Sequence, residues 1–170
     1  MNIICNKTSI ICLVGENMKI CALAVKISKN EKNENIKFRI ETEIIKQINN
    51  GVLYFMLALY SENDILLAEK VIEIRKKHSN IHIFAVMPGF YYLSGQTKKN
   101  KNRINNIVSQ CTAVEKVMFT DEKHWVKAAD EILIKNSQVI IIITDIPLPH
   151  KSWIELAADL YCKEKVIIKV

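Results

Sequence analysis

The chain has 170 residues, of which 49% are hydrophobic and 25% are charged, so it suits one globular domain with a sizeable core. Its net charge of +6 comes mainly from lysine, and three arginines are weak support for nucleic-acid recognition, which favours arginine. No apolar run reaches the ~20 residues of a membrane span, and the widely spaced cysteines, without a CxxC pair, indicate free thiols in a reducing cytoplasm.

The first half of the chain predicts two strands and two helices, with one segment left open. In chain order we expect a strand at Thr8–Val14, a polar loop at Lys29–Asn35, a helix from Ile36 to a stop at Asn50 and Gly51, a strand at Val52–Met56 and a helix at Asn63–His78. Asn63 or Asp64 is expected to cap the second helix. The segment Lys19–Ser28 fits both the start of a helix and a short strand.

The second half continues the alternation of strands and helices. In chain order we expect a strand at Ile81–Pro88, a long loop at Gly89–Asn102, a helix at Arg103–Cys111, a strand at Ala113–Thr120, a helix at Asp121–Ser137, a strand at Gln138–Thr144, a rigid loop at Asp145–His150, a helix at Lys151–Glu164 and a strand at Lys165–Val170. The central strands are apolar throughout, which is typical of parallel strands buried on both faces. The chain therefore predicts a single three-layer, Rossmann-like α/β domain over residues 1–170, with an open, mostly parallel sheet of about six strands.

Ligands of open α/β sheets bind beyond the carboxyl ends of the strands, where the strand order reverses. The segments expected at that edge are Gly15–Asn17, Leu57–Asp64, Pro88–Lys101, Thr120–His124 and Thr144–Trp153. Helix N-termini at such an edge offer free N–H groups and partial positive charge to an anion. A nucleotide site would normally place glycines there, yet no glycine lies between Gly51 and Gly89.

Three stretches carry a resemblance to a known family: YFMLALYSENDILLAEKVIEI, IHIFAVMP and ILIKNSQVIIIIT. They resemble the YpsA-like family of the SLOG superfamily, Rossmann-like proteins related to the Lonely-Guy phosphoribohydrolases. Asp64 stands at the family's acidic position, Glu69 in its Ala-Ala-Glu helix, Pro88 at the end of its next strand, Gln96 at its glutamine and Ser137 in its Asn/Asp-Ser step. The resemblance implies a nucleotide or a nucleotide-derived small molecule as the ligand.

The departures from the family pattern remove either glycine or positive charge. The turn glycines fall on Ala58 and Glu62, and the family's Gly-His-Arg becomes Gly15-Glu16-Asn17. The Gly-Gly-Thr turn before the last helix becomes IPLPHKSW, which has no glycine. The resemblance therefore implies a degenerate phosphate-binding turn.

The candidate ligand-binding residues are Gly15, Glu16, Asn17, Asp64, Glu69, Pro88, Gln96, Lys98 and Ser137. The basic segment from Gln96 to Arg103 is the best remaining anion site of the chain. Each candidate also has a structural alternative: Asp64 can cap its helix, Glu69 can form a structural ion pair, and Ser137 can bond within a turn. We expect no metal site, because no histidine shows metal-ligand spacing, and no catalytic residue, because no cysteine or serine lies near a histidine in a triad-like pattern. We also expect no cofactor.

Three hypotheses for the function follow. The first is a small-molecule-binding module whose crevice is lined by Asn17, Asp64 and Gln96, without a nucleic-acid or membrane partner. The second is a scaffold that acts through protein contacts or self-association as a homodimer, with its crevice filled by Tyr60, Glu62 or the Pro147–Trp153 segment. The third, and weakest, is an N-glycosidase or phosphoribohydrolase that uses Asp64 and Glu69.

Overall fold

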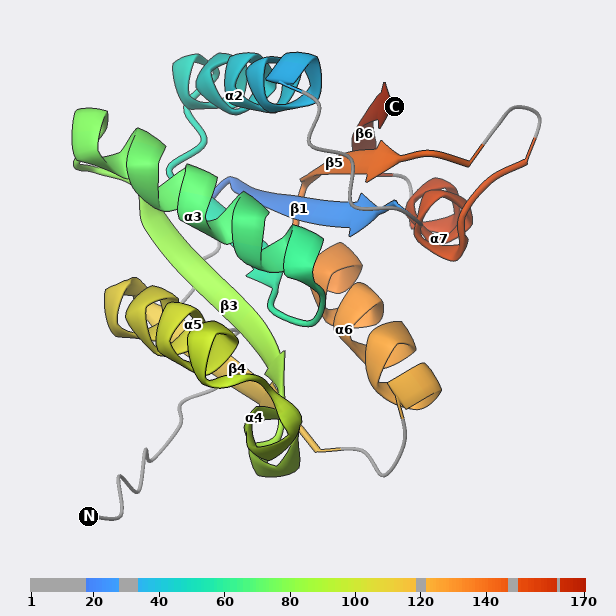
Figure 1. The fold of residues 1–170 in the computed structure, drawn as a ribbon. Helices are drawn as coiled ribbons and strands as arrows, with labels where there is room; N and C mark the ends of the chain where they lie inside the picture. The colour runs from blue at the N-terminus through green and yellow to red at the C-terminus, as the bar shows by residue number, and fades with distance from the viewer. Residues whose placement is uncertain (1–17, 28–33, 119–121, 147–149, 162) are drawn as a thin grey trace.

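The computed structural model of the protein describes residues 18–27, 34–118, 122–146, 150–161 and 163–170. They form one sheet of six parallel strands in the order β4-β3-β2-β1-β5-β6, with helices on both faces (Figure 1). The strands are β1 (Ile20–Lys26), β2 (Tyr54–Ala58), β3 (His82–Pro88), β4 (Ala113–Val117), β5 (Val139–Thr144) and β6 (Glu164–Lys169). The helices are α2 (Glu34–Asn49), α3 (Glu62–Lys77), α4 (Phe90–Gly95), α5 (Lys98–Gln110), α6 (Glu122–Lys135) and α7 (Trp153–Leu160). The predicted α/β architecture is therefore confirmed.

The segment that the sequence left open, Lys19–Ser28, contains the central strand β1. Five consecutive residues from Ile20 to Ala24 are buried, so the run faces protein on both sides, as a central parallel strand must. The strand predicted at Thr8–Val14 lies outside the described residues. The loop predicted at Gly89–Asn102 is wrong in part, because it contains the short helix α4 and the first turns of α5.

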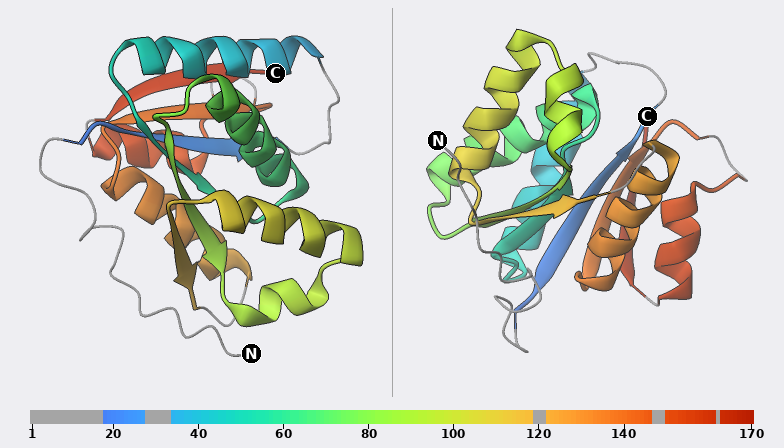
Figure 2. Two further views of the ribbon diagram at one scale, coloured as in Figure 1. Left: turned by 90° about the vertical axis from the view of Figure 1, so that its left-hand side faces the viewer. Right: turned by 90° about the horizontal axis from the view of Figure 1, so that it is seen from below.

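Alternate residues of each strand point to opposite faces and build two separate apolar layers. Leu23, Leu57 and Ile141 lie in the layer beneath α2, α3 and α5. Their strand neighbours Ala24, Ala58 and Ile142 lie in the layer beneath α6 and α7. The view from below shows the sheet running between these two groups of helices (Figure 2). None of the helices in the described ranges is long and apolar enough to cross a membrane.

The strand order reverses at β1, which pairs with β2 on one side and β5 on the other. From β1 the chain proceeds through α2 to β2 and on to the β4 edge, and it returns through α6 to β5. The segments that leave β1 and β5 at their carboxyl ends therefore lead to α2 and α7, on opposite faces. This switch in direction leaves room for a ligand between the two strand ends.

Helix α2 ends at Asn49, and Gly51 in the turn that follows has a φ of +83°, which lies in the left-handed region. We expect Gly51→Ala to lower the free energy of unfolding by about 1 kcal/mol, because a Cβ is strained in that conformation. Space is not the cause, since a Cβ at Gly51 would meet nothing within 4 Å. Urea denaturation checks this, with Gly95→Ala as the control.

Gly95 is also open around its Cβ position but has no positive φ, so Gly95→Ala is expected to be neutral or stabilising. Equal losses in the two variants would contradict the conformational explanation.

Candidate functional site

A cavity of about 360 Å³ lies at the switch in strand order. We call it the switch-point cavity. Its walls come from the carboxyl ends of β1 and β2, from the start of α3, from α6 and from the residues that follow β5. The lining residues with polar or aromatic groups are Lys26, Tyr60, Ser61, Asp64, Trp125, Asp130 and Asp145. Its volume is at the lower end of the ~300–1,000 Å³ range of small-molecule sites.

An ion pair joins two walls of the switch-point cavity. Lys26, the last residue of β1, places its Nζ 2.8 Å from Oδ1 of Asp130 on α6. Burial raises the pKa of Asp130, and the charge and hydrogen bond of Lys26 oppose that effect. Burying a carboxylate without a partner costs free energy, so the contact with Lys26 stabilises the charged form of Asp130.

The start of α3 is closed by a capping box at another wall. Ser61 is the N-cap, and its backbone N–H and its hydroxyl both donate to Oδ2 of Asp64 at 2.8 Å. The prediction that Asn63 or Asp64 caps the helix is therefore wrong: Asp64 is the third helical residue and completes the box. Burial raises the pKa of Asp64 to about 6, although the bonds from Ser61 act in the opposite direction.

Three aromatic rings support the remaining wall. Tyr60 stacks on Trp125 with ring centroids 4.9 Å apart and on Tyr92 at 6.1 Å. The Tyr92 hydroxyl donates to the backbone carbonyl of Tyr60, and burial raises the pKa of Tyr92 to about 12, so this donor stays protonated. Helix α4, which carries Tyr92, thus positions Tyr60. The indole N–H of Trp125 is buried and has no hydrogen-bond partner, which costs about 1–3 kcal/mol.

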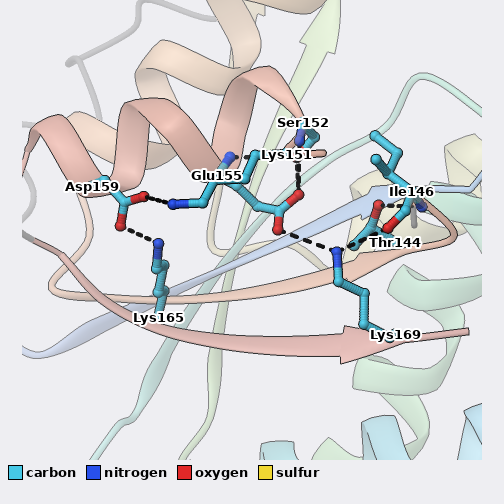
Figure 3. A network of polar contacts seen from close by, with 8 residues as sticks. All are labelled: Thr144, Ile146, Lys151, Ser152, Glu155, Asp159, Lys165 and Lys169. Carbon is cyan, nitrogen blue, oxygen red and sulfur yellow. Dashed lines mark hydrogen bonds and ion pairs between the residues drawn. The ribbon is translucent and has the colours of Figure 1, made fainter. Parts of the chain in front are cut away.

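A second capping box lies at the start of α7 (Figure 3). The Ser152 backbone N–H and hydroxyl both donate to Oε2 of buried Glu155 at 2.8 Å. Lys169 on β6 donates to the Ile146 carbonyl at 3.0 Å and to Oε1 of Glu155 at 3.4 Å. Burial alone would raise the pKa of Glu155, but the bonds from Ser152 and Lys169 outweigh it and lower that pKa. The first turn of α7, like that of α3, therefore contains a buried carboxylate that binds the N-cap serine.

The charges around the cavity are mainly negative. Of the described lining residues, Asp64, Asp130 and Asp145 carry negative charge and Lys26 carries positive charge. Carboxylates accept hydrogen bonds from hydroxyl and amine groups and repel other anions. Within the described part of the chain, no group of three or more His, Cys, Asp or Glu side chains could hold a metal ion. The carboxylates therefore suit a ligand that offers hydrogen-bond donors.

The structure brings one predicted site residue, Asp64, into the cavity lining. Gln96 and Lys98 lie instead at the junction of α4 and α5, where the Gln96 side chain accepts from Asn100 and Lys98 is exposed. Neither residue lines the switch-point cavity. Gly15, Glu16 and Asn17 lie outside the described residues.

Three further predicted positions have structural contacts away from the cavity. Pro88 is the last, buried residue of β3, in register with Val117 of β4. Ser137 donates to the Leu133 carbonyl at 2.7 Å and precedes β5, so it lies at the amino end of that strand. Glu69 forms an ion pair with Arg103 of α5.

Arg103, the arginine of the anion site predicted at Gln96 to Arg103, is part of an ion-pair network. Arg103 donates from Nε and Nη2 to the two oxygens of Glu69, at 2.7 and 2.8 Å, and from Nη1 to Glu62. This bidentate pairing ties α5 to α3 and raises the pKa of Arg103. Since the guanidinium is committed to two carboxylates, Arg103 has no donor fork to offer to a phosphate.

Sequence reasoning missed Lys26 and Asp130 as site residues. Lys26 ends the run whose secondary structure was ambiguous, so its place at a carboxyl edge was not apparent. Asp130 gave one signal: it is a lone carboxylate among Ala129, Leu133 and Ile134 on the apolar side of a predicted helix. A charge on the buried face of a helix indicates a partner from another element.

We expect the free energy of unfolding of the wild type to rise relative to that of Asp64→Asn as the pH falls from 7 to 4. The folded-state pKa of about 6 exceeds the ordinary 3.8, so the folded protein binds more protons than the unfolded chain between these values. The wild type should gain on the order of 2 kcal/mol across that window relative to the variant. Urea denaturation at several pH values measures the difference.

The control for this pH series is Asp159→Asn. Hydrogen bonds from Lys151 and Lys165 lower the pKa of Asp159, so its contribution is lost only at a pH below the ordinary 3.8. Its difference from the wild type should therefore not grow between pH 7 and 5. A flat profile for Asp64→Asn as well would show that Asp64 titrates as an ordinary aspartate.

We expect Lys26→Met to destabilise the protein by about 2 kcal/mol, because it leaves Asp130 buried and unpaired. The figure is below that of a fully buried pair, since 24% of the Lys26 side chain is exposed. The double variant Lys26→Met/Asp130→Ala should be more stable than Lys26→Met alone, because no buried charge remains. Urea denaturation of the two single variants and the double variant measures the coupling, and simple additivity would contradict it.

No protein-family model matches the chain, and its comparison with curated protein sequences gives no match. The resemblance to the YpsA-like family therefore stays a prediction from the motifs.

Proposed function

We propose that this chain is a small-molecule-binding domain that holds a nucleotide-derived ligand in the switch-point cavity. The observation that carries the proposal is the position of this cavity, at the carboxyl edge of the sheet where the strand order reverses. Open α/β sheets bind their ligands at that place because strand ends and loops of opposite direction part there. The resemblance to nucleotide-binding Rossmann-like proteins supports the ligand class.

The polar lining supports a binding role. Asp64 and Asp130 are 7% and 3% exposed, and burial disfavours the charged form of both. Perturbed carboxylates in a cavity are more frequent at functional sites than elsewhere. The stacked rings of Tyr60 and Trp125 add an aromatic wall, which suits a planar ligand.

The scaffold hypothesis expects Tyr60, Glu62 or the Pro147–Trp153 segment to fill this space, and residues 147–149 of that segment lie outside the described residues. Tyr60 instead stacks against Trp125 as part of the wall, and Glu62 is paired with Arg103. An opening of about 360 Å³ remains beside them. These contacts favour binding over a purely structural use of the fold.

A thermal-shift screen tests the proposal, with nucleosides, nucleotides, NAD, ADP-ribose and cyclic dinucleotides as the panel. A ligand at ~100 times its Kd should add roughly 2.7 kcal/mol to the free energy of unfolding. We expect that gain to disappear in Ala58→Ile, because Ala58 lines the cavity and a β-branched side chain there reduces its volume.

The matched control is Ala113→Ile, the same change in the edge strand β4, outside the cavity lining. It should keep the gain. Ala129→Leu, on the α6 wall, is a second blocking variant in case Ala58→Ile folds poorly. No shift with any member of the panel, or a shift that survives both blocking variants, would contradict the proposal.

A further inference from the structure

We propose that the switch-point cavity takes a single unphosphorylated, nucleoside-sized ligand that presents hydrogen-bond donors, and that it discriminates against the corresponding phosphate. This inference rests on the proposed function and narrows its ligand class. It follows from where the charges of the site already have their partners. Two features carry it: the closed start of α3 and the commitment of Lys26.

Helix α3 begins at a wall of the cavity, and the N-terminus of a helix is a common binding site for a phosphate. In this chain the carboxylate of Asp64 already occupies the N–H and hydroxyl of Ser61. The first-turn residue Glu62 adds a second carboxylate at the same helix start. The carboxylate of Asp64 is thus the anion that interacts with the helix dipole, and a phosphate would have to displace this carboxylate.

Lys26 is not available to bind a phosphate either, because it is already paired with Asp130. Among the described residues that line the cavity, Lys26 is the one with a positive charge, and its Nζ lies 2.8 Å from Asp130. A phosphate that recruited Lys26 would leave the carboxylate of Asp130 buried without its counter-ion. It would also approach Asp64 and Asp145, which line the same space.

The same groups are suited to a neutral ligand. Oxygen atoms of Asp64, Asp130 and Asp145 can accept hydrogen bonds from hydroxyl or amine groups. Tyr60 and Trp125 supply apolar wall for a planar ring system. A volume of about 360 Å³ at the lower limit of ligand sites fits one nucleoside-sized molecule and not a dinucleotide.

The test compares four pairs by calorimetric titration at pH 7.5: adenosine, guanosine, cytidine and uridine, each with its monophosphate. We expect at least one nucleoside to bind, with a Kd at least about 10-fold lower than that of its monophosphate. At this pH Asp64 is ionised and the phosphate carries nearly two charges.

Asp64→Asn removes one of the repelling charges and should narrow the ratio between nucleoside and monophosphate. The matched control is Glu69→Gln, because Glu69 lies on the same helix but binds Arg103 and does not line the cavity. It should leave the ratio unchanged. Melting temperatures without ligand confirm that both variants are folded, and Asp145→Asn replaces Asp64→Asn if that variant is not.

The outcomes separate this inference from the proposed function. A monophosphate that binds as tightly as its nucleoside, and loses binding in Ala58→Ile, overturns the inference and leaves the binding role intact. A ratio that Asp64→Asn and Asp145→Asn both fail to change also overturns the inference. No binding by either member of any pair overturns the inference, and the wider nucleotide panel then decides the proposed function.

Discussion

The ion pair between Lys26 and Asp130 joins the central strand to α6 at the point where the chain reverses its course across the sheet. Two apolar layers would pack without it, but the carboxyl end of β1 would then have no polar link to the helix above it. The pair also makes the cavity unfavourable for an anion, because Lys26, the positively charged residue among its described lining residues, is already bound to Asp130. Its cost is the desolvation of both groups, which a purely structural contact between apolar residues would avoid.

The two capping boxes show how this sheet edge differs from a phosphate-binding one. Both α3 and α7 begin at a serine whose N–H and hydroxyl are bound by a buried carboxylate three residues later. A glycine-rich turn leaves such groups free for a ligand, whereas here the side chain supplies the anion. The absence of glycine between positions 51 and 89 and the presence of Asp64 are therefore two aspects of one local structure.

Much of the fold could be predicted from hydrophobic pattern, because β5 and α3 have the continuous and periodic signals of buried strands and amphipathic helices. The secondary structure of β1 could not be chosen from the sequence, since its six apolar residues from Ile20 to Val25 fit a helix start equally well. The site was largely hidden for another reason. Lys26 and Asp130 are 104 residues apart in the chain, and their contact depends on the crossing of α6 over β1. Asp64 alone could be found, because its signal is local to the start of one helix.

The contacts of Tyr60 have a consequence for the thermodynamics of any association in the cavity. Its ring stacks on those of Tyr92 and Trp125, and its backbone carbonyl accepts from the Tyr92 hydroxyl, so contacts within the protein hold this residue in place. A molecule that enters meets a preorganised surface and does not have to immobilise this side chain. The entropy cost of ordering the ring is met during folding, when Tyr92 of α4 packs against the core and contacts Tyr60. Affinity at this wall is therefore set in part by α4, an element that does not itself line the cavity.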